Sequence, residues 1–198
     1  MDGVQAFDQE VFKAIHLGWK SVLLDPVFLV FSYMGLTQIQ VLGTLILLKW
    51  RATKLYVLPL LVSILSAGIL GQIIKQLLIP RERPSNLALA VPQEAWKHSS
   101  FPSGHTITSF ALAFMLVYVT VGTRRAWIGY VALVWAALVG LSRIYRGVHW
   151  PSDVLASMFL GAAVAAAVYL ILDRVGHWLK LESPEATLTG REASEAAG

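Results

Sequence analysis

The sequence contains no cysteine, and charged residues make up only 14% of its 198 positions. The absence of cysteine excludes disulfide bonds and thiolate metal sites, and it leaves the redox compartment open. A soluble domain usually carries about 25% charged residues, whereas 56% of this chain is hydrophobic. This composition indicates an integral membrane protein.

Two other features are missing from the chain. Residues 1–12 lack the basic stretch and short apolar core of a cleaved signal peptide, so we expect insertion through the protein's own helices. No internal repeat is evident. The formal net charge of +4 comes mainly from basic residues at the ends of apolar runs. Such residues face lipid headgroups, and nucleic acid is therefore not an expected partner.

The apolar residues fall into long runs. Between residues 7 and 24, large apolar side chains recur every three or four positions, which predicts an amphipathic helix lying in the membrane interface. The sequence leaves open whether this region adds a sixth span. We expect an all-α, polytopic membrane bundle of about five transmembrane helices, or six with that addition. The five predicted spans are residues 27–48, 55–79, 103–121, 126–145 and 151–172.

The predicted organisation has three parts: an interfacial helix (residues 1–26), a transmembrane domain (27–180) and a tail (181–198) with too little apolar surface to fold. If five spans alternate, the basic clusters near residues 49–54, 124–125 and 174–180 all fall on one side. The positive-inside rule makes that side cytoplasmic. The other ends of the spans would then face outward.

A second group of charged residues and histidines lies at those outward ends. Several cations occur there without enough nearby carboxylates to neutralise them, which predicts an anionic ligand. Phosphate suits both the planar fork of arginine and the point charge of lysine. The residues predicted to gather at this level are Lys75, Arg81, Arg83, His105, Arg143, His149 and Asp153.

Two segments at this level have patterns suited to phosphate chemistry. Ser103, Gly104 and His105 stand at a predicted helix start, where free N–H groups and a glycine make a cradle for an anion. His105 would point towards that anion, as a general acid must. His149 and Asp153 are four residues apart at the next helix start, so they share one face. The carboxylate would fix the imidazole tautomer, as in a catalytic triad with histidine as the nucleophile.

These segments resemble the signatures of the type 2 phosphatidic acid phosphatase family, which is related to the vanadium haloperoxidases. The segments are KQLLIPRERP from Lys75, PSGH from Pro102 and SRIYRGVHWPSD from Ser142. The second and third match fully. The first has seven residues between Lys75 and Arg83 where the commonest form has six, and Pro80 or a local helix bulge would absorb the extra one.

The resemblance implies a lipid phosphatase that needs neither metal nor cofactor. His149 would form a phosphohistidine, His105 would protonate the leaving oxygen and Asp153 would hold His149. Lys75, Arg83 and Arg143, with Ser103 and the Gly104 amide, would bind the phosphate oxygens. The implied substrates are prenyl diphosphates, phosphatidylglycerol phosphate, phosphatidic acid or lipid A phosphates. The short chain and short loops favour a bacterial plasma membrane, and the alternation of the spans places the site on its external side.

Other functions and roles stay open from the sequence. The same phosphohistidine would serve a lipid phosphotransferase, and the cationic cluster alone would serve a lipid-phosphate binder or transporter. Arg81 is a candidate for a second phosphate of a diphosphate, and Lys97 and His98 for headgroup contacts. His16, His177 and Trp150 fit interfacial anchoring better than chemistry. The oligomeric state is left undetermined.

Overall fold

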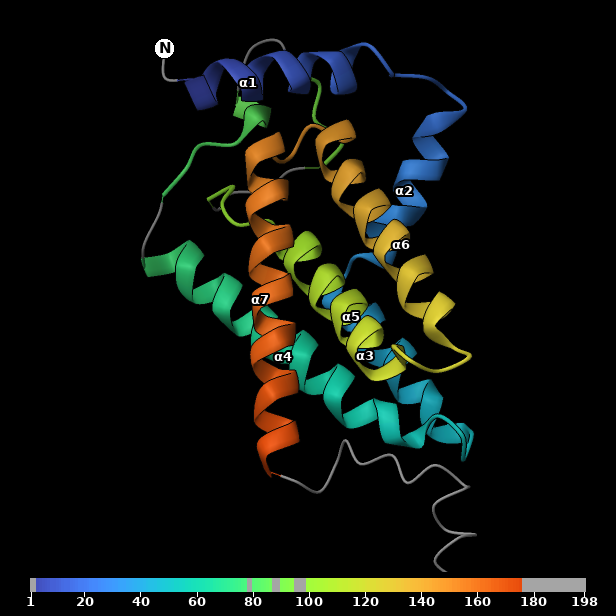
Figure 1. Cartoon of the computed structure of the whole chain (residues 1–198). Coiled ribbons are helices and arrows are strands. Elements are labelled where there is room, and N and C mark those ends of the chain that lie inside the picture. The colour runs from blue at the N-terminus through green and yellow to red at the C-terminus, as the bar shows by residue number, and fades with distance from the viewer. Residues whose placement is uncertain (1–2, 78–79, 87–89, 95–98, 176–198) are drawn as a thin grey trace, which may run out of the picture.

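The computed structural model describes residues 3–77, 80–86, 90–94 and 99–175. The predicted tail (181–198) lies outside the described residues, as do Lys97, His98 and His177. All regular elements in the described part of the chain are helices, without any strand, as predicted (Figure 1). The chain therefore folds as an all-α bundle.

Three helices are long and apolar enough to cross a membrane: α4 (Lys54–Leu77), α6 (Ala126–Tyr145) and α7 (Pro151–Val175). Helix α5 (Gly104–Thr120) is apolar but shorter, at 17 residues. These four helices match the predicted spans 55–79, 126–145, 151–172 and 103–121. Helix α5 packs against α4, α6 and α7 and forms the centre of the bundle (Figure 1).

The core between these helices depends on large apolar side chains and on close backbone contacts. Leu60, Met115 and Ala165 pack together where α4, α5 and α7 meet. A Cβ atom on Gly161 would lie 2.6 Å from the Ile107 carbonyl oxygen. Lipid tails are as apolar as these side chains, so helices in a membrane associate chiefly through tight packing of this kind. The contact between α5 and α7 therefore requires a glycine.

The first predicted span, residues 27–48, is not one straight helix. It is divided into α2 (Leu24–Met34) and α3 (Thr37–Ile46), which continues as a 3₁₀ turn (Leu47–Lys49), and the two parts are bent by 69°. Taken as one broken span, this pair would join α4, α6 and α7 as a fourth crossing, whereas α5 is shorter than such a crossing requires. At the break, a Cβ on Gly35 would lie 2.5 Å from Val139 Cγ1 and 3.1 Å from His105 Cδ2. The glycine lets the chain turn directly against α5 and α6.

Helix α1 (Gly3–Phe12), with the π-helical turn Lys13–Leu17, lies across one end of the bundle (Figure 1). Its polar residues Asp8 and His16 are buried, whereas Phe7 is exposed. The prediction that His16 anchors the chain in the interface is wrong. Its ring donates from Nδ1 to the Tyr145 carbonyl (2.7 Å) and accepts the Val91 N–H at Nε2 (3.0 Å), so it ties α1 to the bundle.

The opposite end of the bundle carries the basic connections. Arg125, in the turn before α6, donates from Nη1 to the Ala52 carbonyl at 3.3 Å. The connection between α3 and α4 therefore lies beside the connection between α5 and α6, as the alternation of spans predicted (Figure 1). Arg124 lies in the same turn, and Lys54 begins α4 there.

Candidate active site

A cavity of about 230 Å³ lies between the ends of several helices. Its wall is formed by the break between α2 and α3, the last turns of α4 and α6, the start of α5 and the segments before α5 and α7. The lining residues are Leu36, Thr37, Gln38, Gln72, Lys75, Arg83, Gly104, His105, Arg143 and His149. The structure thus brings both predicted histidines and all three predicted phosphate-binding cations to one small space.

The extra residue between Lys75 and Arg83 does not separate these two cations. Lys75 lies in the last turn of α4, and Arg83 lies in the extended segment that follows Pro80. Both side chains line the same cavity.

At the start of α5, the two predicted cradle residues Ser103 and Gly104 have different roles. Ser103 is fully buried as the N-cap, where its hydroxyl oxygen accepts from the Thr106 N–H (3.4 Å) and the Thr106 hydroxyl (2.9 Å). Its own N–H donates to Ser157 Oγ at 2.9 Å. Ser103 is not among the residues that line the cavity, so the structure assigns it to capping. Gly104 does line it, and an added Cβ there would meet no atom within 4 Å.

His149 sits immediately before α7 with its two ring nitrogens in different surroundings. Nε2 lies 3.4 Å from Arg83 Nη1 on the cavity side. Nδ1 lies 3.6 Å from Asp153 Oδ2, which is too long for a hydrogen bond, and it has no other partner. Asp153 itself is held at Oδ2 by the Trp150 N–H (3.0 Å), as an acid in the first turn of a helix often is. The carboxylate therefore lies behind the ring, away from the cavity.

Burial controls the charge of the ring. Loss of water around His149 lowers its pKa to about 4, although the Asp153 carboxylate acts in the opposite direction. Arg143 and Arg83 also lower this pKa. The imidazole is thus neutral near pH 7, and one ring nitrogen keeps its lone pair. Burial also lowers the pKa of Arg83 to about 10, which still leaves the guanidinium charged at neutral pH.

Arg143 is held by a carboxylate that the sequence argument did not include. Glu94 accepts from Arg143 Nη1 (3.0 Å) and Nη2 (2.8 Å), and from Arg146 Nε at 2.6 Å. Arg143 Nη1 also donates to Ser32 Oγ. The Nε of Arg143 is buried without a hydrogen-bond partner. The expectation of cations without nearby carboxylates was therefore wrong for Arg143.

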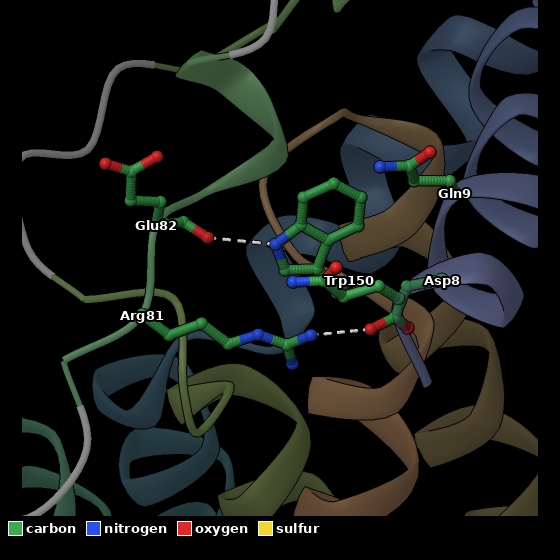
Figure 2. Close-up of a pocket in the computed structure, with 6 residues that line it drawn as sticks. Asp8, Gln9, Arg81, Glu82 and Trp150 are labelled. Carbon is green, nitrogen blue, oxygen red and sulfur yellow. Dashed lines mark hydrogen bonds and ion pairs between the residues drawn. The ribbon is translucent and has the colours of Figure 1, made fainter. Parts of the chain in front are cut away.

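Two further expectations change in the structure. Arg81 does not line the phosphate-sized cavity, because its terminal nitrogens bind Asp153 (2.5 Å) and Asp8 (2.5 Å). The suggestion that Arg81 meets a second phosphate is therefore not supported. Trp150 donates from its indole nitrogen to the Glu82 carbonyl at 2.9 Å, and so fixes the loop beside α1 (Figure 2). Within the described part of the chain, no three His, Asp or Glu side chains gather to hold a metal ion.

A multi-pass helical bundle whose cations and histidines surround one small cavity defines a membrane protein that handles an anionic group. Residues 56–176 match the PAP2 superfamily, and the chain belongs to this family. An undecaprenyl-diphosphatase from Sulfolobus acidocaldarius is 29% identical over 163 residues, covering 80% of this chain and 75% of that protein. PAP2 members are phosphatases of lipid phosphate esters and diphosphates, and the chain is an enzyme of this class.

Two solved structures share the fold. The transmembrane PAP2-type phosphatidylglycerolphosphate phosphatase from Bacillus subtilis superposes with a TM-score of 0.75 at 24% identity, covering 90% of each chain. LpxE from Aquifex aeolicus superposes with a TM-score of 0.71 at 28% identity, covering 81% of this chain and 93% of that one. The helical arrangement of this chain is therefore that of membrane PAP2 phosphatases.

Proposed function

We propose that the enzyme removes phosphate from the headgroup of a membrane lipid through a phosphohistidine at His149. The observation that carries the proposal is the setting of this ring. It is neutral, it presents Nε2 towards the cavity beside Arg83, and it has Asp153 behind Nδ1. A nucleophile backed by an orienting carboxylate is the arrangement that covalent catalysis needs.

In the first step, the lone pair on Nε2 of His149 attacks phosphorus. The bond from phosphorus to the leaving oxygen breaks, and His105 gives that oxygen a proton. The Nδ1–H of His149 then faces Asp153, whose negative charge stabilises the ring while it carries the phosphoryl group. His105 lines the same cavity as His149, which supports this division of labour.

In the second step, water attacks phosphorus of the phosphohistidine. The neutral His105 accepts a proton from that water, the bond between nitrogen and phosphorus breaks, and inorganic phosphate leaves. The lone pair returns to Nε2, and His105 is again protonated for the next turnover. The two steps use one acid–base group in both directions.

Lys75, Arg83 and Arg143 would neutralise the charge on the three equatorial oxygens of the phosphoryl group. Positioning and electrostatic stabilisation are the main requirements of phosphoryl transfer. These three cations line the cavity, and the Gly104 position leaves open space for an oxygen to approach the start of α5. In this account the protein's own cations take the part that a divalent metal plays in many other phosphatases.

The size of the cavity favours a lipid headgroup. A space of about 230 Å³ lined by Lys75, Arg83 and Arg143 suits a phosphate group, and the hydrocarbon chains would stay in the bilayer. We propose a polyprenyl diphosphate as the first substrate to test, since a relative aligned over 80% of this chain and 75% of its own length is an undecaprenyl-diphosphatase. The basic connections at the opposite end support a site on the external side of the membrane.

Phosphate release by the purified enzyme in detergent tests the proposal. The assay compares undecaprenyl diphosphate, phosphatidylglycerol phosphate, phosphatidic acid and a lipid A phosphate, each with EDTA present. We expect turnover of at least one lipid, with the diphosphate fastest, and no loss of rate on chelation. Binding without phosphate release from any of the four would contradict the enzyme assignment and favour a lipid-phosphate binder.

A further inference from the structure

Asp153, which lies behind His149, is linked through Arg81 to the N-terminal helix α1. Asp8 of α1 is 1% exposed, although it is an acid on a helix at the end of the bundle. Figure 2 shows its carboxylate directed at the guanidinium of Arg81, beneath Trp150. An acid buried this deeply requires strong partners, because desolvation disfavours its charge.

Asp8 finds those partners at the start of α7. One carboxylate oxygen accepts the Ser152 N–H at 2.8 Å, and the other accepts the Ser152 hydroxyl at 2.6 Å. Ser152 is the second residue of α7, where a backbone N–H has no partner within its own helix. Asp8 thus caps α7 from another helix, and its negative charge lies at the positive end of the α7 dipole.

Arg81 joins this cap to the catalytic carboxylate. Its Nη2 donates to Asp8 Oδ2 at 2.5 Å, and its Nη1 donates to Asp153 Oδ1 at 2.5 Å. Asp153 is then fixed at one oxygen by Arg81 and at the other by the Trp150 N–H. A continuous line of contacts runs from Asp8 through Arg81 and Asp153 to the ring of His149.

The space beside these residues is a cavity of about 340 Å³ lined by Gln5, Asp8, Gln9, Arg81, Glu82 and Trp150. An anion entering it would compete with Asp8 and Asp153 for the guanidinium. The pairing already present therefore favours a supporting role over a second phosphate site.

We propose that Asp8 is a positioning residue for phosphoryl transfer: through Arg81 and Ser152 it sets the place of Asp153, which orients His149. The inference rests on the proposed function of His149. It makes the N-terminal helix a part of the catalytic apparatus. Loss of an outer partner of a catalytic group commonly costs about 10- to 100-fold in activity, as seen for the outer partners of metal ligands.

The substitution Asp8→Asn tests this directly, because it keeps one oxygen to accept the Ser152 N–H and replaces the oxygen that accepts from Arg81 with an uncharged NH2 group. We expect kcat to fall by about 10-fold or more while KM stays within about twofold, since the phosphate-binding cations are untouched. Glu82→Gln is the matched control, because it removes the same charge from the same cavity at an exposed position. We expect that control to keep the wild-type kcat.

A double-mutant cycle separates positioning from mere stability. If Asp8 acts through Asp153, adding Asp8→Asn to Asp153→Asn lowers kcat no further, and Arg81→Lys alone reproduces the fall in kcat even where Asp8→Asn folds poorly. Additive losses, or an unchanged kcat in both Asp8→Asn and Arg81→Lys, would overturn the inference. Full turnover in His149→Gln would instead contradict the proposed function, so the two failures are distinguishable.

Discussion

Replacing His149 by glutamine should lower kcat by at least about 10⁴-fold, because removal of a covalent nucleophile leaves only binding and electrostatic catalysis. Glutamine keeps a buried polar side chain of similar reach, and the three cations of the cavity remain in place. Binding of the substrate should therefore survive, with KM changed by no more than a few fold. The measurement is phosphate release under saturating lipid, together with direct lipid binding.

A His149→Gln enzyme that keeps more than a few per cent of wild-type turnover would mean that water, or another side chain, attacks phosphorus. The thermal stability of wild type and His149→Gln should be measured as a control, because His149 is buried and its replacement could disturb the fold. Its backbone N–H, which donates to the Arg143 carbonyl at 3.3 Å, is unchanged by the substitution.

The second large effect is expected at Arg83. Its Nη1 donates to the Val148 carbonyl at 2.8 Å and lies 3.4 Å from His149 Nε2, so it faces the point where the phosphoryl group would be transferred. Arg83→Ala should reduce kcat by about 10³-fold, within the range for loss of an arginine that stabilises phosphoryl transfer. Arg83→Lys should recover only part of the rate, because lysine cannot form the planar fork.

Arg124→Ala provides the control for this loss of positive charge. Arg124 lies in the turn before α6, at the end of the bundle opposite the cavity. Its removal should leave kcat and KM unchanged in the phosphate-release assay. A similar loss of rate in Arg124→Ala and Arg83→Ala would mean that general charge or insertion, rather than the cavity, determines the activity.

Local sequence patterns were sufficient to predict the positions of α4, α5, α6 and α7 and most of the cavity wall. The helix starts at Gly104 and Pro151 carry their own signals, a capping serine and a first-turn proline. Because each motif sits at the end of a span, alternation of the spans was enough to bring Lys75, His105 and His149 to one level.

Local patterns could not predict the carboxylates that distant segments bring to the arginines near the site. Asp8 and Glu94 look like ordinary acids in the sequence, and only tertiary contacts place them on Arg81 and Arg143. The bend at Gly35 was missed for a similar reason. At this bend Gly35 lies close to Val139 and His105, neither of which is near it in the chain.

The arrangement explains how a small chain can support demanding chemistry in a membrane. Helix α5 is packed on three sides by α4, α6 and α7, and the active residues lie where these helices begin or end. The cavity thus lies at the helix ends and the segments that join them, while α1 closes the same end of the bundle (Figure 1). Support by packed helices limits the reorganisation needed during transfer.

The central claim is that His149 carries the phosphoryl group. The most direct measurement is to quench the enzyme during turnover of a ³²P-labelled lipid phosphate and to map the label by mass spectrometry under alkaline conditions that preserve phosphohistidine. The account predicts label on His149 in the wild type and none in His149→Gln. A phosphoryl group on another residue, or label retained in His149→Gln, would contradict it.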